Sequence, residues 1–133
     1  MVCAGTVTFN IPSNNQPYTA NGGCTASSPY TLFALWPHMH QVATHTKFEL
    51  THNGTTTTLL DEPYSFTEQK YWPQTPEVQV AQGDDLKVTC TWQNNTGTSI
   101  HWGDSSTAEM CFTGLYRYPA KNSGLFDCTN GGF

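Results

Sequence analysis

Residues 44–60 read THTKFELTHNGTTTTLL and carry the clearest structural signal in the chain. Residues 44–51 are predicted to form a strand, and Phe48 and Leu50 alternate with polar residues there. The pair Asn53-Gly54 follows, and both residues tolerate the positive φ that a tight two-residue hairpin turn requires. Residues 56–60 then form a second run of Thr and Leu. The stretch therefore predicts a β-hairpin.

The same period of two recurs along the rest of the chain. We expect further strands at residues 7–11, 30–36, 77–80, 86–92 and 108–118. Residues 12–29 are rich in Asn, Gly, Pro and Ser, and residues 63–76 are irregular and aromatic, so both are predicted to be loops. Because the chain shows no sustained helical period, repeat or linker, we expect one all-β domain over residues 1–133, an antiparallel β-sandwich or jelly roll with disulfides.

Composition excludes several classes of partner. The 133 residues include 10 acidic and 5 basic side chains, for a formal net charge of -5. So few basic residues offer no electrostatic footprint for nucleic acid. The sequence contains no apolar run of the ~20 residues that a membrane span needs. Aromatic residues make up 13% of the chain, which argues against disorder.

The five cysteines are typical of an oxidising compartment, so we expect a secreted, periplasmic or otherwise extracytoplasmic protein. No export leader opens the sequence, and we expect that any such signal has been removed. The odd count leaves one cysteine without a partner in the chain, and Cys3 is the natural candidate. Cys90 and Cys111 lie in alternating strands on either side of a turn at residues 93–97, which predicts a disulfide between them.

Residues 37–40, PHMH, form the first candidate site. Side chains at positions i and i+2 of an extended backbone share a face, so His38 and His40 can converge on one metal ion while Met39 points into the core. Met110 offers a thioether, a soft ligand that selects copper over zinc when it joins imidazoles. The alternatives are two unrelated surface histidines and a methionine that only packs in the core.

Several motifs follow one another in a recognisable order. They are PHMH (37–40), LLD (59–61), YSFTEQ (64–69), GDDLKVTCTW (83–92), WG (102–103), EMC (109–111) and YRYP (116–119). Together they resemble the C-terminal domain of the copper type II, ascorbate-dependent monooxygenases, the family that includes peptidylglycine α-hydroxylating monooxygenase and dopamine β-monooxygenase. The resemblance covers most of the chain, from about Cys24 to Cys128.

The resemblance implies a ligand set and a chemistry. Members hold the copper that activates O2 with two histidines and one methionine, which correspond to His38, His40 and Met110. Three protein ligands leave an open position, the mark of a catalytic metal site. The expected reaction is hydroxylation of a substrate C–H bond with O2 or peroxide and ascorbate or another external reductant. His101 and Glu109 are expected to contact the ligand residues, and so to orient them, without binding the metal themselves.

The resemblance also implies the disulfide pattern. The family pairs the cysteines that correspond to Cys24 and Cys128, and those that correspond to Cys90 and Cys111. Cys3 is then left alone, in agreement with the count of five. The second bridge would hold the strand that presents Met110.

Two departures from the family concern the reaction. Members use a second copper, held by three histidines of an N-terminal domain, and this chain has only His45, His52 and His101 beyond the first site. Their spacing does not form the expected cluster. We interpret His45 as an exposed strand residue and His52 as a solvated turn residue.

The substrate side departs as well. Peptide-hydroxylating members carry an Arg that anchors the substrate carboxylate at the position of Trp36, and an Asn and a Tyr at those of Phe112 and Gly114. An indole cannot replace a guanidinium that binds a carboxylate with two hydrogen bonds. We therefore expect Trp36 and Phe112 to face a flat, apolar or sugar-like substrate, with Tyr71 and Trp72 as further candidates. The alternative for each is an aromatic side chain that only packs in the core.

Three functions remain open on the sequence. The first is a mononuclear copper protein of the monooxygenase family that oxidises an unknown small molecule or peptide with an external reductant, partner domain or redox protein. The second is a non-catalytic protein for copper storage, delivery or sensing. The third is an interaction module, such as a carbohydrate-binding one, with a vestigial metal site. Turnover of a substrate with ascorbate separates the first from the second, and ligand binding that survives a chelator favours the third.

Overall fold

Strands and the turns between them make up the whole of the described part of this computed structural model, residues 1–121 and 124–130. The strands are β1 (Val2–Thr6), β2 (Asn10–Ile11), β3 (Pro17–Thr25), β4 (Tyr30–His38), β5 (Ala43–His52), β6 (Thr55–Pro63), β7 (Trp72–Val80), β8 (Asp85–Gln93), β9 (Ile100–His101), β10 (Cys111–Tyr118) and β11 (Cys128–Asn130). Within these residues, no helix has the length and apolar character needed to cross a membrane.

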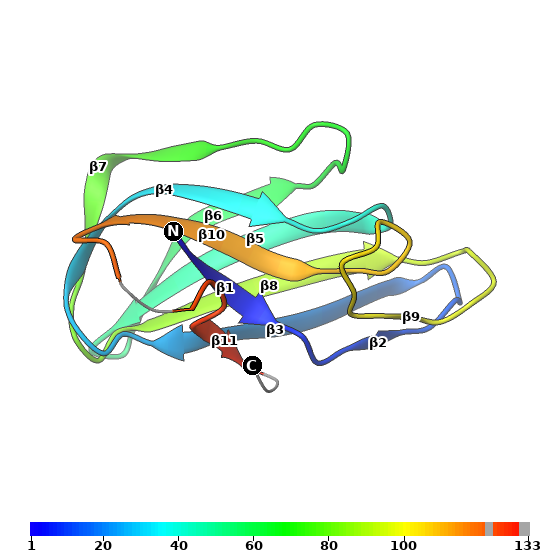
Figure 1. Ribbon diagram of the computed structural model, residues 1–133, viewed down its shortest axis with the longest axis horizontal. Coiled ribbons are helices and arrows are strands. Elements are labelled where there is room, and N and C mark those ends of the chain that lie inside the picture. The colour runs from blue at the N-terminus through cyan, green and yellow to red at the C-terminus, as the bar shows by residue number, and fades with distance from the viewer. Residues whose placement is uncertain (122–123, 131–133) are drawn as a thin grey trace.

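The strands form two facing sheets, which Figure 1 shows as the layers of a sandwich. The five-stranded sheet has the order β11-β1-β10-β4-β7, and the four-stranded sheet has the order β3-β8-β5-β6. A short pair, β2 with β9, lies at one end. The pairings are antiparallel except that of β1 with β11, which is parallel. The all-β sandwich expected from the sequence is confirmed.

The hairpin predicted from residues 44–60 is β5 with β6. Asn53 and Gly54 form its turn and have φ values of 48° and 79°, as the Asn-Gly pair requires. The strands at residues 30–36, 77–80 and 86–92 are confirmed and belong to β4, β7 and β8. The predicted last strand begins later than expected, at Cys111, and β7 begins earlier, at Trp72.

Two parts of the sequence prediction are wrong. The first is the expected loop at residues 12–29, which contains the 9-residue strand β3. This strand pairs with β8 from Pro17 to Thr25, and Gly23 permits the close approach, since a Cβ there would lie 1.8 Å from the carbonyl oxygen of Leu86. The second is the strand at residues 7–11, of which only Asn10–Ile11 forms a strand, β2. Strand β1 ends at Thr6, whose hydroxyl accepts a hydrogen bond from the amide of Thr8, and the chain turns there.

The two predicted disulfides both join one sheet to the other. Cys24 of β3 is bonded to Cys128 of β11, and Cys90 of β8 is bonded to Cys111 of β10. The bridges span 104 and 21 residues of sequence. Loops of these lengths correspond to about 5 and about 3 kcal/mol of stabilisation in the chain-entropy account. Cys3 is the free cysteine, as predicted, and it is buried.

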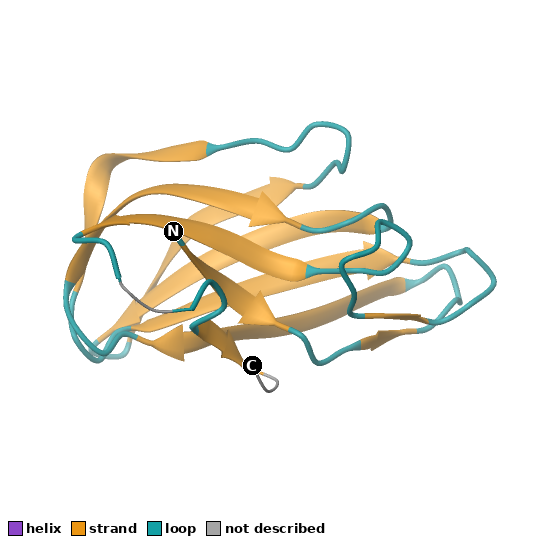
Figure 2. Cartoon of the chain, in the orientation of Figure 1, coloured by secondary structure: helices purple, strands orange, loops and turns teal. Residues whose placement is uncertain are grey.

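Buried side chains from both sheets meet between these bridges. The largest fully buried side chains include Trp92, Phe48, Leu35 and Met39. The loops that follow β4, β6 and β8 and the segment that precedes β10 gather at one end of the sandwich, on the right in Figures 1 and 2. The predicted ligand residues lie on these segments, so this end of the fold carries the candidate site.

Candidate metal centre

The histidine pair lies where β4 ends. His38 is the last residue of the strand, and His40 follows in the loop. Met39 between them is completely buried, while the two imidazole rings lie together with centroids 5.2 Å apart and planes at 85°. The prediction that the histidines share a face and Met39 enters the core is confirmed. His38 is half-buried and His40 is only 4% exposed.

Both imidazoles have an oxygen acceptor at the same ring nitrogen. Nδ1 of His38 lies 3.0 Å from Oε1 of Gln69, and Nδ1 of His40 lies 3.1 Å from the carbonyl oxygen of Ala108. An oxygen that only accepts requires a proton on Nδ1, which leaves the lone pair on Nε2 for a metal. Burial lowers the pKa of His38, and the neighbouring His40 lowers it further, whereas the contact with Gln69 opposes the change. A lowered pKa favours the neutral imidazole that a metal needs.

The strand register brings Met110 to the same place. Strands β4 and β10 are antiparallel, and Phe112 lies opposite His38. Met110 and His40 each lie two residues beyond this pair, outside both strands, and the amides of both residues contact Oε1 of Glu109. The next residue, Cys111, is fixed to β8 by its disulfide with Cys90. The methionine is therefore presented from a backbone that is covalently tied to the opposite sheet.

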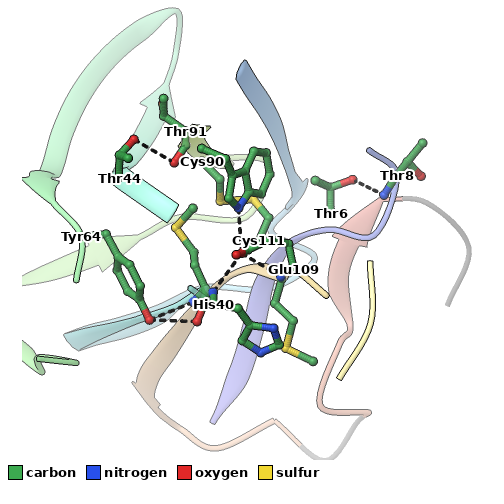
Figure 3. The surroundings of a disulfide bond; sticks show 12 residues. Thr6, Thr8, His40, Thr44, Tyr64, Cys90, Thr91, Glu109 and Cys111 are labelled. Carbon is green, nitrogen blue, oxygen red and sulfur yellow. Dashed lines mark hydrogen bonds between the residues drawn. A yellow bond between two sulfur atoms is a disulfide. The ribbon is translucent and has the colours of Figure 1, made fainter. Parts of the chain in front are cut away.

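Glu109 connects the two ligand segments (Figure 3). Its side chain is completely buried. Oε1 accepts hydrogen bonds from the amide of His40 at 2.9 Å and the indole of Trp92 at 2.8 Å, and Oε2 accepts one from the amide of Val42 at 3.0 Å. The amide of Met110 lies 3.3 Å from Oε1. Burial raises the pKa of this carboxyl, and the N–H donors act in the opposite direction.

The loop at residues 64–71 supports the histidines from the other side. The Tyr64 hydroxyl accepts a hydrogen bond from the amide of Met39 at 3.1 Å and donates one to its carbonyl oxygen at 3.0 Å, as Figure 3 shows. The ring of Phe66 meets that of His40 at 72°, with centroids 5.8 Å apart. Sequence reasoning assigned no role to Tyr64, Phe66 or Gln69. The YSFTEQ segment of the family resemblance was the signal that could have identified them.

The other predicted site residues, Trp36, Phe112 and His101, differ in their exposure and in what they contact. Trp36 is partly exposed, and its ring stacks on His38 with centroids 5.2 Å apart and planes at 18°. Phe112 is only 2% exposed, and its ring packs against Phe126 at 4.7 Å. The exposed His101 accepts a hydrogen bond from the amide of Glu109 through its backbone carbonyl and lines a hollow of about 510 Å³.

The other two histidines lie on the four-stranded sheet, each beside an aspartate. Nε2 of His45 is 2.5 Å from Asp61, and Nδ1 of His52 is 2.5 Å from Asp84. Their side chains are 39% and 54% exposed, as expected for surface residues. In the described ranges 1–121 and 124–130, no group of three or more His, Cys, Asp or Glu side chains is arranged to hold a metal.

This donor set has a definite chemical preference. Two neutral imidazoles and one thioether carry no charge, so they suit a soft metal of low charge better than Ca²⁺ or Mg²⁺, which take oxygen ligands. Imidazole serves both oxidation states of copper, and the thioether favours Cu(I). The residues present therefore fit a copper ion. The fixed Nδ1 contacts and the buried Glu109 would hold the donors in place with or without the metal.

Comparison with known proteins finds relatives among the monooxygenases. The chain is similar to a tyramine beta-hydroxylase of Caenorhabditis briggsae, with 27% identity over 122 residues, which covers 84% of this chain and 21% of the relative. It is also similar to DBH-like monooxygenase protein 1 of Homo sapiens and of Mus musculus, with 25% and 26% identity over 126 residues and the same coverage. The chain thus spans about a fifth of the length of these curated relatives.

A family description covers nearly the whole chain. The copper type II ascorbate-dependent monooxygenase C-terminal domain matches residues 1–130. This range includes both disulfides, the histidine pair and Met110. The chain belongs to the copper type II, ascorbate-dependent monooxygenase family, as a representative of its C-terminal domain.

Proposed function

We propose that this chain is a single domain that holds one copper ion through His38, His40 and Met110 and uses it to oxidise substrate C–H bonds. The observation that carries the proposal is the shared arrangement of the two imidazoles, whose Nδ1 atoms both face oxygen acceptors. Their Nε2 atoms are then available to bind copper, and we expect the thioether of Met110 to complete the set of donors. Bound copper would supply one-electron chemistry with O2 or peroxide.

The protein's own residues have three tasks in this proposal. Gln69 and Ala108 keep the imidazoles in one tautomer. Glu109 joins the loop of His40 to the segment of Met110, so that the donors from two different elements stay in register. Trp36 covers one face of His38 and presents an indole to whatever approaches the centre. An indole at this position favours an apolar or sugar-like substrate over a carboxylate.

The compartment and the source of electrons belong to the same proposal. Two disulfides in the fold support an extracytoplasmic location, where such bonds form and persist. Electrons would come from ascorbate, another small reductant or a partner domain or redox protein, since the family is ascorbate-dependent.

A second candidate is copper storage, delivery or sensing without turnover. The positions of the other histidines favour it: His45 and His52 are each beside a different aspartate on the four-stranded sheet. The second copper that the sequence resemblance implies for complete enzymes therefore has to come from elsewhere. Consumption of O2 with ascorbate, together with a hydroxylated product, distinguishes catalysis from simple carriage of the metal.

The first experiment is a copper titration of the disulfide-bonded protein under reducing but thiol-free conditions. We expect one copper ion per chain. His38→Ala and His40→Ala should each weaken binding by at least tenfold, because each removes one of three donors. His45→Ala is the matched control, since its ring contacts Asp61 on the outside of the other sheet, and it should leave the affinity unchanged. Equal affinity in all three variants would contradict the ligand assignment.

A further inference from the structure

The outer faces of the two sheets differ in chemistry. On the four-stranded sheet, the outward positions that alternate with buried Phe48 and Val88 hold residues such as Lys47, Glu49 and Lys87. These are ordinary side chains for a face in water, and Lys47 pairs with Glu49. The outward positions of the five-stranded sheet hold aromatic rings instead. An aromatic face that stays exposed indicates an interaction site.

Four of these rings form a continuous aromatic row, made of Tyr118, Phe33, Tyr116 and Tyr71. The centroids of Phe33 lie 5.9 Å from Tyr118 and 6.1 Å from Tyr116. Tyr116 lies 5.2 Å from Tyr71 in an edge-to-face contact. Tyr71 and Tyr118, at the two ends, are each 49% exposed. The row crosses β10 and β4 and reaches the residue that precedes β7.

Along β4 the row leads to the candidate metal centre. Trp36 and His38 continue the outward face beyond Phe33, and the indole of Trp36 stacks on the imidazole of His38. At about 3.3 Å per residue, the five positions from Phe33 to His38 span about 17 Å. A ligand lying along the strand over this distance would contact several rings and reach the histidine pair. Such a ligand is extended rather than compact.

The charged residues beside the row are turned away or occupied. The Arg117 guanidinium lies 3.8 Å from the ring centroid of Tyr30 and donates to the carbonyl oxygen of Pro119. Glu77 accepts a hydrogen bond from the Tyr118 hydroxyl, and the ammonium of Lys70 lies 5.9 Å from the centroid of Trp72. Among the described residues beside the row, no cluster of cations is left to bind a polyanion, and the chain has a net charge of -5.

The neutral polar groups of this face can bind hydroxyls. The Thr31 hydroxyl donates to Gln79 beside the row, and the amide and hydroxyl groups of this pair retain further hydrogen-bonding capacity. The phenol groups of the exposed tyrosines offer both a flat apolar ring and a hydroxyl. Sugar rings have the matching combination of an apolar C–H face and a rim of hydroxyls. A neutral polysaccharide therefore complements this face in shape, charge and hydrogen bonding.

We propose that the aromatic row is a binding face for an extended, neutral polysaccharide. The binding itself requires no copper. If the function proposed above holds, this binding also assigns the substrate class of the metal centre. A polysaccharide bound along β4 passes over Trp36 to the histidine pair.

The test measures depletion of the chelator-treated protein from solution by insoluble cellulose, chitin, mannan and xylan. We expect binding to at least one of them, and a fall of at least fivefold in the association constant for Tyr71→Ala/Tyr118→Ala. Thr58→Ala, an exposed change on the other sheet, is the control and should bind like the wild type. Thermal denaturation of each variant shows that the fold is kept, since both tyrosines are half-exposed.

Three outcomes would overturn this proposal. They are no wild-type binding to any of the four polysaccharides, equal binding by the double tyrosine variant, or a wild-type dimer in light scattering that the double variant abolishes. His38→Ala/His40→Ala separates the two proposals. If this variant loses copper but binds the polysaccharide normally, the metal centre and the binding face are both supported. If the wild type binds polysaccharide but no copper, only the function proposed above fails.

Discussion

Glu109→Gln is the substitution that examines the organisation of the centre most closely. It keeps the size of the side chain and replaces one carboxylate oxygen with an NH2 group. Oε2 receives the amide of Val42, while Oε1 receives the amide of His40 and the indole of Trp92. Whichever oxygen is replaced, at least one buried N–H then faces another donor.

The better orientation of the glutamine keeps Oε1 and gives up only the contact with Val42. A hydrogen bond to a charged group is worth ~1.5–3 kcal/mol, and a buried donor without a partner costs ~1–3 kcal/mol. These values overlap in part, so we expect a loss of about 2–4 kcal/mol in the free energy of unfolding. For a chain of this size, each kcal/mol lowers Tm by about 3–5 °C, which gives a fall of about 6–20 °C.

The assay is thermal and urea denaturation of the oxidised protein, together with a Cu(I) titration of the folded variant. Oε1 of Glu109 receives the amides of both His40 and Met110, and the glutamine keeps these contacts through its own oxygen, so copper binding should weaken by less than the ~10–100-fold expected when such a supporting residue is lost. Glu68→Gln is the control, because Glu68 is exposed, and it should change stability by less than ~0.5 kcal/mol. A Glu109→Gln protein as stable as the control would refute this account of the network.

Three further predictions follow from the buried and charged groups. Only the neutral imidazole binds metal, and burial lowers the pKa of His38. Copper affinity should therefore be constant above the ordinary histidine pKa of about 6.5 and fall at lower pH. A loss of affinity as the pH rises from 6 to 8 would contradict this. Burial raises the pKa of Cys3 to about 11, so a thiol reagent at pH 8 should label it slowly in the native protein and stoichiometrically in denaturant; equal rates would place the thiol on the surface. The backbone hydrogen bond from Ala81, with a smaller part from His52, lowers the pKa of Asp84. The ionised carboxylate therefore stabilises the fold above its pKa in the unfolded chain, near ~3.9, and this stabilisation is lost as the pH falls through its pKa in the folded protein. Asp84→Asn should lower Tm at pH 6 but not in strong acid. A lower Tm of the variant that persists in strong acid would disprove this role of the carboxylate.

Local signals in the sequence predicted much of the sandwich. The turn at Asn53 and Gly54 follows from the positive φ that these residue types accept, and the alternation of residues 86–92 follows from one buried face. Strand β3 was missed because Pro, Asn and two glycines have low strand propensity. Its pairing with β8 and the bridge at Cys24 override that propensity, and Gly23 serves the close approach of the two backbones. Such pairing depends on residues 60 to 76 positions away, which no local pattern contains.

In the candidate site, too, the local features could be predicted from the sequence and the long-range contacts could not. The i and i+2 spacing predicted that His38 and His40 share a face, because this depends only on extended backbone. Spacing could not predict which atoms hold the rings, since Gln69 and Ala108 come from loops 31 and 68 residues away. Spacing also could not predict that Phe112, expected to face substrate, is only 2% exposed and packs against Phe126, because that contact depends on the chain after β10.

X-ray absorption at the copper edge tests the central claim most directly. Copper-loaded protein is reduced with ascorbate under nitrogen, and the wild type is compared with Met110→Leu, which keeps the apolar volume and removes the sulfur. We predict two imidazole nitrogens and one sulfur around copper in the wild type, and loss of the sulfur alone in the variant. A wild-type spectrum without sulfur, or one that is identical in the variant, would contradict the proposed His38, His40 and Met110 centre.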